Sequence, residues 1–252
     1  MDLFDLQGKK AIVTGGSRGL GYGMVQGLLE AGCEVVIIGS SDKALTVSQD
    51  FIKQGYKCHG IKADLKIEDE NNRSFNEAVE YFKGDLDILV TAAGIQRRHN
   101  AENFPLKDWE EVLNVNLNSV FLMCQLAGNL MLKKGHGKII NVASMLSFFG
   151  GNTVCAYAAS KGGVAQFTKA LSNEWASKGI NVNAIAPGYM ATEMNIALIE
   201  DETRNTEILS RIPAKRWGKP EDMKGLVIFL ASQASDYLNG AIIPVDGGYL
   251  SR

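Results

Sequence analysis

Tyr157 and Lys161 are four residues apart in "CAYAASKGG" (155–163), and only small side chains separate them. In a helix, residues at this spacing lie on one face, one turn apart. A phenol ordinarily loses its proton near pH 10, and a neighbouring ammonium group favours the phenolate. The spacing therefore predicts an acid–base pair in which Lys161 lowers the pKa of Tyr157. Two unrelated residues on a solvated helix are the alternative.

A second stretch with chemical potential is "TGGSRGLG" (14–21), which follows a β-branched run and precedes a helical pattern. Gly15, Gly19 and Gly21 would allow a tight turn, close approach of the backbone to a pyrophosphate, and close helix–strand packing. The helix N-terminus would offer free N–H groups and a partial positive charge to phosphates. This placement favours a dinucleotide cradle over a plain flexible turn.

The elements that must position these residues follow from the pattern of apolar side chains. Near-continuous Val/Ile runs indicate strands buried on both faces, as in a parallel sheet. Their alternation with helical segments predicts an α/β fold of right-handed βαβ units, a doubly wound sheet of about seven strands with helices on both faces. Strands are expected at 10–15, 34–40, 56–64, 86–94, 137–144, 180–188 and 241–248, and helices at 19–31, 42–54, 67–82, 106–132, 157–177 and 221–231.

We expect residues 1–252 to form a single domain, because no linker or low-complexity tract interrupts the chain. The least regular segment, 189–216, follows the sixth strand and is expected to contain a helix at 193–209. Ligands of open α/β sheets bind beyond the carboxyl ends of the strands. A long segment at this place is therefore a candidate substrate lid.

Composition limits the possible partners and the location. The 252 residues carry a net charge of −2, which gives no reason to expect nucleic acid or an anionic membrane. No apolar run approaches the roughly 20 residues that span a bilayer, and the N-terminal sequence lacks the features of a signal peptide. A cytoplasmic location is expected.

The cysteines and histidines point to neither a disulfide framework nor a metal site. The four cysteines lie far apart, and the three histidines have no partner at metal-ligand spacing. Cys155 is close to Tyr157, so a catalytic thiol is one alternative. The favoured interpretation is that Cys155 is a small apolar side chain that packs in the core. No metal is expected.

The glycine spacing Gly-x-x-x-Gly-x-Gly, Ser144, the Tyr157/Lys161 pair and "AAG" (92–94) occur together in one order. With these motifs the chain resembles the short-chain dehydrogenase/reductase family over essentially its whole length. The resemblance implies a single-domain Rossmann-type fold that binds NAD(H) or NADP(H). The family's usual phrase after the fourth strand is Asn-Asn-Ala-Gly, whereas this chain begins it with Thr91. This departure falls at the position whose asparagine contacts normally steady the neighbouring strand.

The resemblance also implies four catalytic roles. Tyr157 would give its proton to a ketone or take one from an alcohol, and Lys161 with the oxidised nicotinamide would lower its pKa. A pKa near 7 corresponds to about 4 kcal/mol of differential stabilisation. Ser144 would hydrogen-bond the substrate oxygen as charge develops there. Asn116 would hold a water in a proton path through Lys161. Taken singly, Ser144 and Asn116 could be structural polar groups.

Coenzyme contacts are implied along most of the chain. Asp64 would meet the adenine ring, and Thr192 would grip the nicotinamide carboxamide or cap the following helix. The full expected set is Gly15, Ser17, Arg18, Gly19, Leu20, Gly21, Ser40, Asp64, Leu65, Ala92, Ala93, Gly94, Tyr157, Lys161, Pro187, Gly188, Met190 and Thr192.

The type of dinucleotide is less clear from the residues. An NAD enzyme usually has an acidic residue at the end of the second strand, where this chain has Gly39-Ser40-Ser41. Arg18 could meet a 2′-phosphate, so the residues alone lean slightly to NADP(H). Relatives that also lack the acidic residue resemble NADH users. NAD(H) is favoured, and NADP(H) stays an alternative.

Longer phrases such as "AAGIQRR" (92–98) and "NVNAIAPGYMAT" (181–192) resemble the bacterial 2-dehydro-3-deoxy-D-gluconate 5-dehydrogenases, with gluconate 5-dehydrogenases close behind. The implied reaction is NADH-dependent reduction of the C5 ketone of 2,5-diketo-3-deoxygluconate, and its reverse. A keto sugar acid suits an arginine fork. Candidate substrate residues, each of which could also be an ordinary surface or wall side chain, are Arg97, Arg98, Met145, Ser147, Tyr189 and Arg204.

Three alternatives stay open. One is a gluconate 5-dehydrogenase (a 5-ketogluconate reductase), and another is a 3-oxoacyl thioester reductase, whose thioester carrier would favour a basic entrance. The third is a non-catalytic dinucleotide-binding sensor, against which the Ser144–Tyr157–Lys161 set argues. Relatives commonly form homotetramers through two long helices, here 106–132 and 157–177, and we expect the same.

Overall fold

The computed structural model describes residues 2–251 and places one seven-stranded parallel sheet at its centre. The strand order is β3-β2-β1-β4-β5-β6-β7, so the direction of winding reverses between β1 and β4. That reversal is the switch point at which ligands bind in doubly wound sheets. The strands are β1 (Lys10–Thr14), β2 (Glu34–Gly39), β3 (Cys58–Lys62), β4 (Ile88–Thr91), β5 (Gly137–Val142), β6 (Ile180–Pro187) and β7 (Ile242–Val245).

The predicted α/β architecture is confirmed, and each expected strand is present but shortened at one or both ends. Alternate residues of a strand serve opposite faces of the sheet. In β1, Ile12 belongs to one apolar cluster and Val13 to the other, and in β4, Leu89 and Val90 divide in the same way. All of these side chains are buried, which explains why the strands read as continuous apolar runs.

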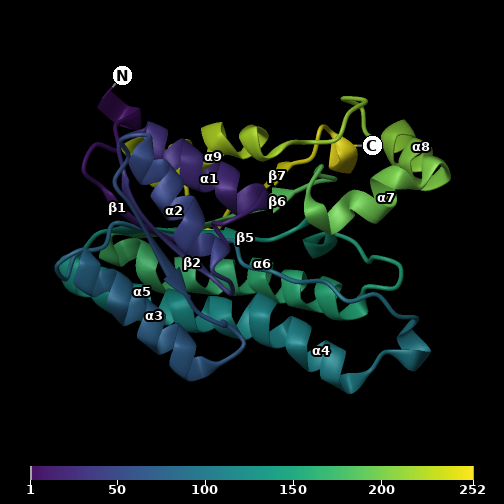
Figure 1. Cartoon of the computed structure of the whole chain (residues 1–252), viewed down its shortest axis with the longest axis horizontal. Coiled ribbons are helices and arrows are strands. Elements are labelled where there is room, and N and C mark those ends of the chain that lie inside the picture. Colours follow the sequence, from purple (N-terminus) through teal and green to yellow (C-terminus); the bar gives the residue numbers. More distant parts are fainter. Residues whose placement is uncertain (1, 252) are drawn as a thin grey trace.

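Helices cover both faces of the sheet (Figure 1). One face carries three helices whose apolar residues share a cluster with the sheet, and the other face carries four. The first group is α1 (Gly19–Glu30), α2 (Lys43–Lys53) and α9 (Lys224–Ala231), and the second is α3 (Glu68–Tyr81), α4 (Leu106–Leu113), α5 (Ser119–Lys134) and α6 (Cys155–Trp175).

The helix expected at 106–132 is interrupted. Asn114–Asn118 form a π-type turn between α4 and α5, a feature that is frequent at functional sites. Within the described range, Leu106–Lys134 is the one helical stretch long and apolar enough, by length and composition alone, to cross a membrane. Half of its most apolar window is buried in the fold, and core helices meet the same criteria. Polar asparagines interrupt the stretch, which is why no continuous apolar run is visible in the sequence.

The candidate lid differs from the single helix expected at 193–209. A 3₁₀ turn at Glu193–Asn195 is followed by α7 (Ile196–Glu200) and α8 (Glu202–Arg211). Asp201 adopts an extended conformation between them, and its carboxylate accepts a 3.0 Å hydrogen bond from the Arg204 N–H. This N-cap starts a new helix and explains the break. Both helices lie at one end of the molecule (Figure 1).

Thr91, which replaces the family's asparagine, has a defined place in the core. Its hydroxyl donates a 2.8 Å hydrogen bond to Asn141 Oδ1, and Asn141 Nδ2 donates at 3.0 Å to the hydroxyl of Thr168. The three residues lie on β4, β5 and α6, and all are buried. The neighbouring strand is therefore steadied by a hydroxyl in place of an amide.

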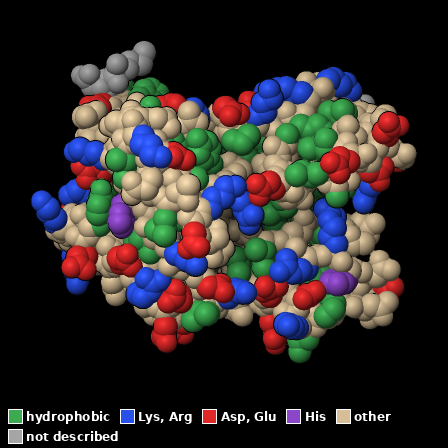
Figure 2. Space-filling model, viewed as in Figure 1, with side chains coloured by type: hydrophobic (Ala, Val, Ile, Leu, Met, Phe, Trp, Pro, Cys, Tyr) green, Lys and Arg blue, Asp and Glu red, His purple; other side chains and the backbone are tan. Residues whose placement is uncertain are grey.

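The surface carries no large area of one charge on the side that Figure 2 shows. Acidic and basic side chains are interspersed there, in keeping with the net charge of −2. Such a surface gives little electrostatic attraction for a polyanion.

Candidate active site

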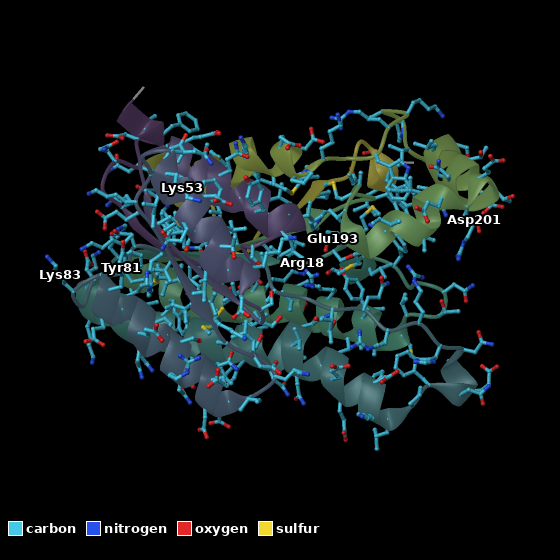
Figure 3. All side chains as sticks on the ribbon, in the orientation of Figure 1. Arg18, Lys53, Tyr81, Lys83, Glu193 and Asp201 are labelled. Atoms are coloured by element: carbon cyan, nitrogen blue, oxygen red, sulfur yellow. The ribbon has the colours of Figure 1, made fainter. Side chains whose placement is uncertain are left out.

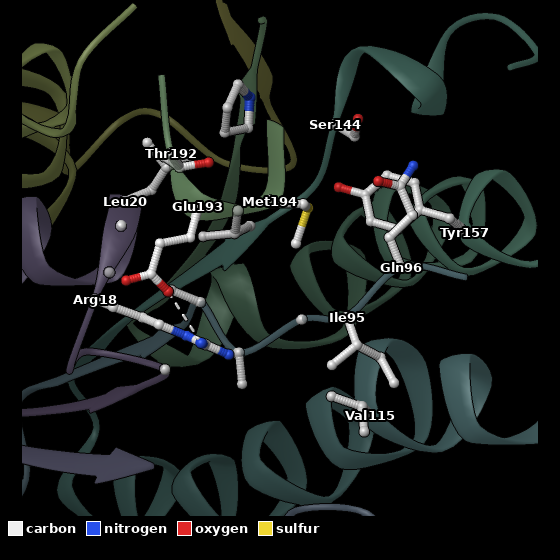
Figure 4. Close-up of a pocket in the computed structure, with 18 of the residues that line it drawn as sticks. Arg18, Leu20, Ile95, Gln96, Val115, Ser144, Tyr157, Thr192, Glu193 and Met194 are labelled. Atoms are coloured by element: carbon white, nitrogen blue, oxygen red, sulfur yellow. Dashed lines mark hydrogen bonds and ion pairs between the residues drawn. The ribbon is translucent and has the colours of Figure 1, made fainter. Parts of the chain in front are cut away.

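A cavity of about 600 Å³ opens at the carboxyl ends of the central strands (Figure 4). Its walls come from the loop between β1 and α1, the ends of β2, β4, β5 and β6, the start of α6, and residues 192–195 of the candidate lid. The volume falls in the range of small-molecule and cofactor sites. The switch point of the sheet therefore coincides with a cavity large enough for a ligand.

The glycine loop forms one wall because larger side chains do not fit there. Gly15 has a φ of +69°, and a Cβ on it would lie 2.6 Å from Cα of Ala93. A Cβ on Gly21 would lie 2.3 Å from the carbonyl oxygen of Gly15. Helix α1 begins at Gly19 and directs its N-terminus at the cavity wall. Bare backbone at a helix N-terminus suits a pyrophosphate, so the loop fits a dinucleotide.

Every residue expected to contact the coenzyme lies on the wall of this cavity, from Gly15 in the first loop to Thr192 in the candidate lid. Sequence reasoning missed several others, most of which are close sequence neighbours of residues already predicted. These are Gly39, Lys66, Ile95, Gln96, Glu111, Val115, Val142, Ala143, Glu193, Met194 and Asn195.

Tyr157 and Lys161 share one face of α6, as their spacing predicts. The Lys161 ammonium lies 5.7 Å from the centroid of the Tyr157 ring and donates a 2.7 Å hydrogen bond to the carbonyl of Val142. Lys161 is buried, and no carboxylate pairs with it among the described residues. Burial lowers the pKa of Lys161 to about 8.

The expected lowering of the Tyr157 pKa by Lys161 is wrong for the protein alone. Burial is the largest influence and raises the pKa of the phenol, and a hydrogen bond with Ser144 opposes this in part. The ammonium lies over the ring and bonds to Val142, so it stabilises the phenolate little. A further positive charge in the cavity would lower this pKa.

Ser144 lies two residues after the end of β5 and close to Tyr157 in Figure 4. Its Oγ accepts a 3.1 Å hydrogen bond from the Leu146 N–H, while Ser147 Oγ accepts one from the Ser144 N–H at 3.3 Å. This reciprocal cap fixes the Ser144 side chain, which also forms a hydrogen bond with Tyr157. The Ser147 hydroxyl donates instead to the carbonyl of Lys161 at 2.7 Å.

Asn116 lies in the π-type turn behind the cavity wall. Its Oδ1 accepts a 2.8 Å hydrogen bond from the Ile95 N–H, and its Nδ2 donates to the carbonyl of Ile95 at 2.9 Å and to Ser160 Oγ at 3.2 Å. The side chain is fully buried. Asn116 therefore holds the chain that follows β4, and its role toward a water stays a prediction.

Of the six substrate candidates, only Arg97 lies on the cavity wall. Met145 is buried in an apolar cluster with Ile212 and Tyr249, and the ring of Tyr189 packs at 5.3 Å from that of Tyr249. Ser147, like Met145, is held in the turn after β5. None of these three residues lines the cavity.

The three arginine candidates differ in their partners. Arg97 is paired with Glu111 at 2.7 Å. Arg98 and Arg204, on the loop after β4 and on α8, have no carboxylate partner among the described residues. Burial and the charge of Arg204 together lower the pKa of Arg98. The two like charges therefore lie near enough to repel one another.

Thr192 does not cap the turn that follows it, because its hydroxyl makes no capping hydrogen bond. It faces the glycine loop, where a Cβ on Gly19 would lie 3.6 Å from its methyl group. The next residue, Glu193, forms ion pairs with Arg18 at 3.1 Å and with Lys43 at 3.4 Å. Residues 192–195 thus bridge the cavity from β6 to the glycine loop (Figure 4).

The remaining candidate groups lie outside the cavity. Cys33, Cys58 and Cys124 are buried, and burial raises the pKa of Cys33 and Cys58 to about 12. Cys155 is half-buried and lines a separate hollow of about 260 Å³ beside His99. Among residues 2–251, no three His, Cys, Asp or Glu side chains gather as a metal site would require.

Comparisons with known proteins agree with this geometry. Residues 9–203 match the family described as short chain dehydrogenase. The 2-dehydro-3-deoxy-D-gluconate 5-dehydrogenase of Bacillus subtilis (strain 168) is 51% identical over 254 residues, which cover 100% of this chain and 98% of that protein.

Two solved structures superpose over nearly the whole chain. A putative gluconate dehydrogenase from Agrobacterium tumefaciens has a TM-score of 0.97 and 42% identity, with 100% of both chains covered. A gluconate 5-dehydrogenase from Burkholderia cenocepacia J2315, in complex with NADP and tartrate, has a TM-score of 0.95 and 40% identity, with 100% of this chain and 98% of that chain covered. The fold, the cavity and these relatives together show that the chain belongs to the short-chain dehydrogenase family and is an oxidoreductase acting on CH–OH groups with a nicotinamide dinucleotide.

Proposed function

We propose that this protein reduces the C5 ketone of 2,5-diketo-3-deoxygluconate to 2-dehydro-3-deoxy-D-gluconate, and catalyses the reverse oxidation. The observation that carries the proposal is the convergence of Ser144, Tyr157 and Lys161 with the glycine loop on one cavity. The full-length similarity to an enzyme of that name, at 51% identity, supports this choice of substrate.

The chain's own groups would handle the substrate oxygen. A bound nicotinamide supplies or accepts the hydride at C5. Tyr157 donates its proton to the ketone oxygen as the alcohol forms, and Ser144 donates a hydrogen bond to the same oxygen. The raised pKa of Tyr157 keeps the phenol protonated in the free protein, which suits a proton donor. Lys161, with a pKa of about 8, can return a proton to Tyr157 after the reaction.

The substrate's carboxylate is proposed to lie with Arg98 and Arg204. Both arginines lack an acidic partner among residues 2–251, whereas Arg97 is occupied by Glu111. A carboxylate would relieve the repulsion between the two guanidinium groups and form charge-assisted hydrogen bonds with them. Because Arg204 belongs to α8, its pairing would draw the candidate lid, 189–216, toward the loop after β4.

A second candidate is the reduction of 5-ketogluconate. The solved structures from Agrobacterium tumefaciens and Burkholderia cenocepacia bear names of gluconate dehydrogenases at 42% and 40% identity. The second of these structures is in complex with tartrate, a hydroxy acid with two carboxylates.

The test measures NADH and NADPH oxidation side by side with 2,5-diketo-3-deoxygluconate, 5-ketogluconate and an acetoacetyl thioester. We expect the highest kcat/KM with 2,5-diketo-3-deoxygluconate and NADH. A higher value with 5-ketogluconate would transfer the assignment to the second candidate. Turnover of the thioester alone would overturn both, and dinucleotide binding without turnover of any ketone would indicate a sensor.

We also propose that the chain is a cytoplasmic homotetramer and forms a single domain over residues 1–252. Phe121 on α5 is 44% exposed and packs edge-to-face against Phe167 on α6, with ring centroids 5.9 Å apart. Exposed aromatic surface on the two long helices supports an interface there. Light scattering coupled to gel filtration would measure the oligomeric state, and a monomer in solution would overturn the proposal.

A further inference from the structure

Glu193 joins the candidate lid to the coenzyme side of the cavity. It lies on the 3₁₀ turn after Thr192, yet its carboxylate reaches Arg18 in the glycine loop at 3.1 Å and Lys43 at the start of α2 at 3.4 Å. Figure 4 shows the side chains of Arg18 and Glu193 pointing toward one another at the cavity wall. One acidic side chain therefore occupies two cations at the same time.

The position of this cluster matters because the adenosine ribose is recognised at the end of β2 in doubly wound folds. That end reads Gly39-Ser40-Ser41 here, without the acid that NAD enzymes usually have. Gly39, Ser40, Arg18 and Glu193 all line the same cavity. Arg18 and Lys43 alone would attract a 2′-phosphate, since an arginine and a lysine are both good phosphate binders.

The charges of Arg18, Lys43 and Glu193 determine how strongly a 2′-phosphate is attracted to the end of β2. Lys43 and Arg18 hold the pKa of the Glu193 carboxyl below its ordinary value, so the carboxylate is ionised at neutral pH. Asp42, the residue before α2, is paired with Lys62 at 2.9 Å, and among the described residues no ion pair joins it to Arg18. With Glu193 in place, an incoming phosphate meets a net charge of +1 where it would otherwise meet +2.

We infer that Glu193, which lies in the candidate lid, performs the function of the acidic residue that NAD enzymes usually have at the end of β2. It thereby selects against a 2′-phosphate. This inference rests on the proposed preference for NAD(H) and names the residue that produces it. Glu193 acts as a specificity residue by occupying Arg18 and Lys43, and by repelling the 2′-phosphate of NADP(H). The coenzyme preference is then a property of the lid, whose Glu193 is 175 residues from Arg18 in the chain.

The expected size of the effect is modest because the ion pairs are exposed. The side chains of Arg18, Glu193 and Lys43 are 62%, 58% and 49% exposed. Exposed pairs are screened by salt and typically change an equilibrium by less than about tenfold. We therefore expect a preference shift of roughly three- to tenfold at low ionic strength.

The experiment compares two fragments that lack the nicotinamide, 5′-AMP and adenosine 2′,5′-bisphosphate, by calorimetry on the full chain. Glu193→Gln should strengthen binding of the bisphosphate by roughly three- to tenfold and leave 5′-AMP unchanged. Glu200→Gln is the matched control, since it removes one charge from the same segment at an exposed position that forms no ion pair with any described residue. In an Arg18→Gln background, Glu193→Gln should have a smaller effect on the bisphosphate.

Every other outcome overturns the inference. An equal change for both fragments would mean that Glu193 only fastens the lid, and no change for either would leave it without a role. If Glu200→Gln strengthened binding of the bisphosphate as much as Glu193→Gln does, the effect would come from the net charge of the protein alone. The fragments involve no ketone, so these results are independent of the proposed sugar-acid substrate.

Discussion

Lys161 donates a 2.7 Å hydrogen bond to the main-chain carbonyl of Val142 while its ammonium lies over the face of the Tyr157 ring. The bond ties α6 to β5 at the point where both reach the cavity. It also keeps an ammonium group in an almost solvent-free place, where burial disfavours its charge. Catalytic geometry is thus obtained at a cost to folding stability.

The first prediction concerns that cost and its pH dependence. The Lys161 pKa is about 8 in the folded protein and 10.5 ordinarily, so between these values the unfolded chain binds more protons. The buried ammonium lowers the free energy of unfolding by its full amount below pH 8. This cost decreases as the pH rises toward 10.5, by up to about 3 kcal/mol in total. In Lys161→Met this pH-dependent contribution is absent.

The pH-dependent contribution of Lys161 is measured by denaturant unfolding of the ligand-free protein and of Lys161→Met between pH 7 and pH 10. The stability of Lys161→Met relative to the unmodified protein should be highest at pH 7 and fall as the pH rises. The unpaired Val142 carbonyl costs about 1–3 kcal/mol at every pH, so the slope is the diagnostic quantity. A difference that stays constant from pH 7 to pH 10 would contradict the prediction.

The second prediction concerns the proton donor. Tyr157→Phe should lower kcat by roughly 10²- to 10⁴-fold, because it removes a general acid while keeping the ring. Dinucleotide affinity, measured by fluorescence titration, should change little. Tyr81→Phe is the control, since Tyr81 lies on α3 and stacks on His59 far from the cavity (Figure 3). Substantial residual activity in Tyr157→Phe would remove Tyr157 from its proposed role.

Local patterns predicted the features that depend on neighbouring residues. The glycine loop is an example, because the turn after β1, the start of α1 and the left-handed φ of Gly15 are all local requirements. The strands were equally predictable from their Val/Ile content. The break at Asp201 was missed, although Asp is a favoured N-cap residue.

Contacts between distant segments were not predictable in this way. Sequence spacing does not show which loops meet, because tertiary packing decides this. Examples are the ion pairs Arg97–Glu111 and Arg18–Glu193 and the hydrogen bond between Asn116 and Ile95. The direction of the Tyr157 pKa was missed for the same reason. The sequence shows an amine one turn away, whereas the structure shows how far burial and the Val142 carbonyl change its influence.

The third prediction concerns the hydroxyl that replaces an amide on β4. Thr91→Val keeps the shape of the side chain and removes the donor to Asn141 Oδ1, which then has only the Cys124 thiol at 3.3 Å. The free energy of unfolding should fall by about 1–3 kcal/mol. Thr46→Val is the matched control on the exposed face of α2 and should change it by less than about 0.5 kcal/mol. Equal effects would show that the buried hydrogen bond contributes nothing.

The fourth prediction separates backbone conformation from close approach in the glycine loop. Gly8 and Gly15 have nearly the same φ, +73° and +69°, but a Cβ on Gly8 would have no neighbour within 4 Å, whereas one on Gly15 would have several. Gly8→Ala should cost about 1–2 kcal/mol for the left-handed conformation alone. Gly15→Ala should cost about 1–3 kcal/mol more and weaken dinucleotide binding, because its methyl group would meet the Ala93 backbone. If Gly8→Ala and Gly15→Ala were equally destabilising, the glycine loop would accommodate the added methyl group without strain.

The last prediction tests the carboxylate site. Arg98→Gln should raise KM for the sugar acid by roughly tenfold or more with little change in kcat, because a charge-assisted hydrogen bond is worth about 1.5–3 kcal/mol. Arg204→Gln should act in the same direction, and the double variant should lose less than the sum of the two if both groups hold one carboxylate. Arg73→Gln removes the same charge from α3, where Arg73 pairs with Glu70 and Glu77, and should leave KM unchanged. Purely additive losses from Arg98→Gln and Arg204→Gln would place the two arginines on separate parts of the substrate, and unchanged KM values would exclude both.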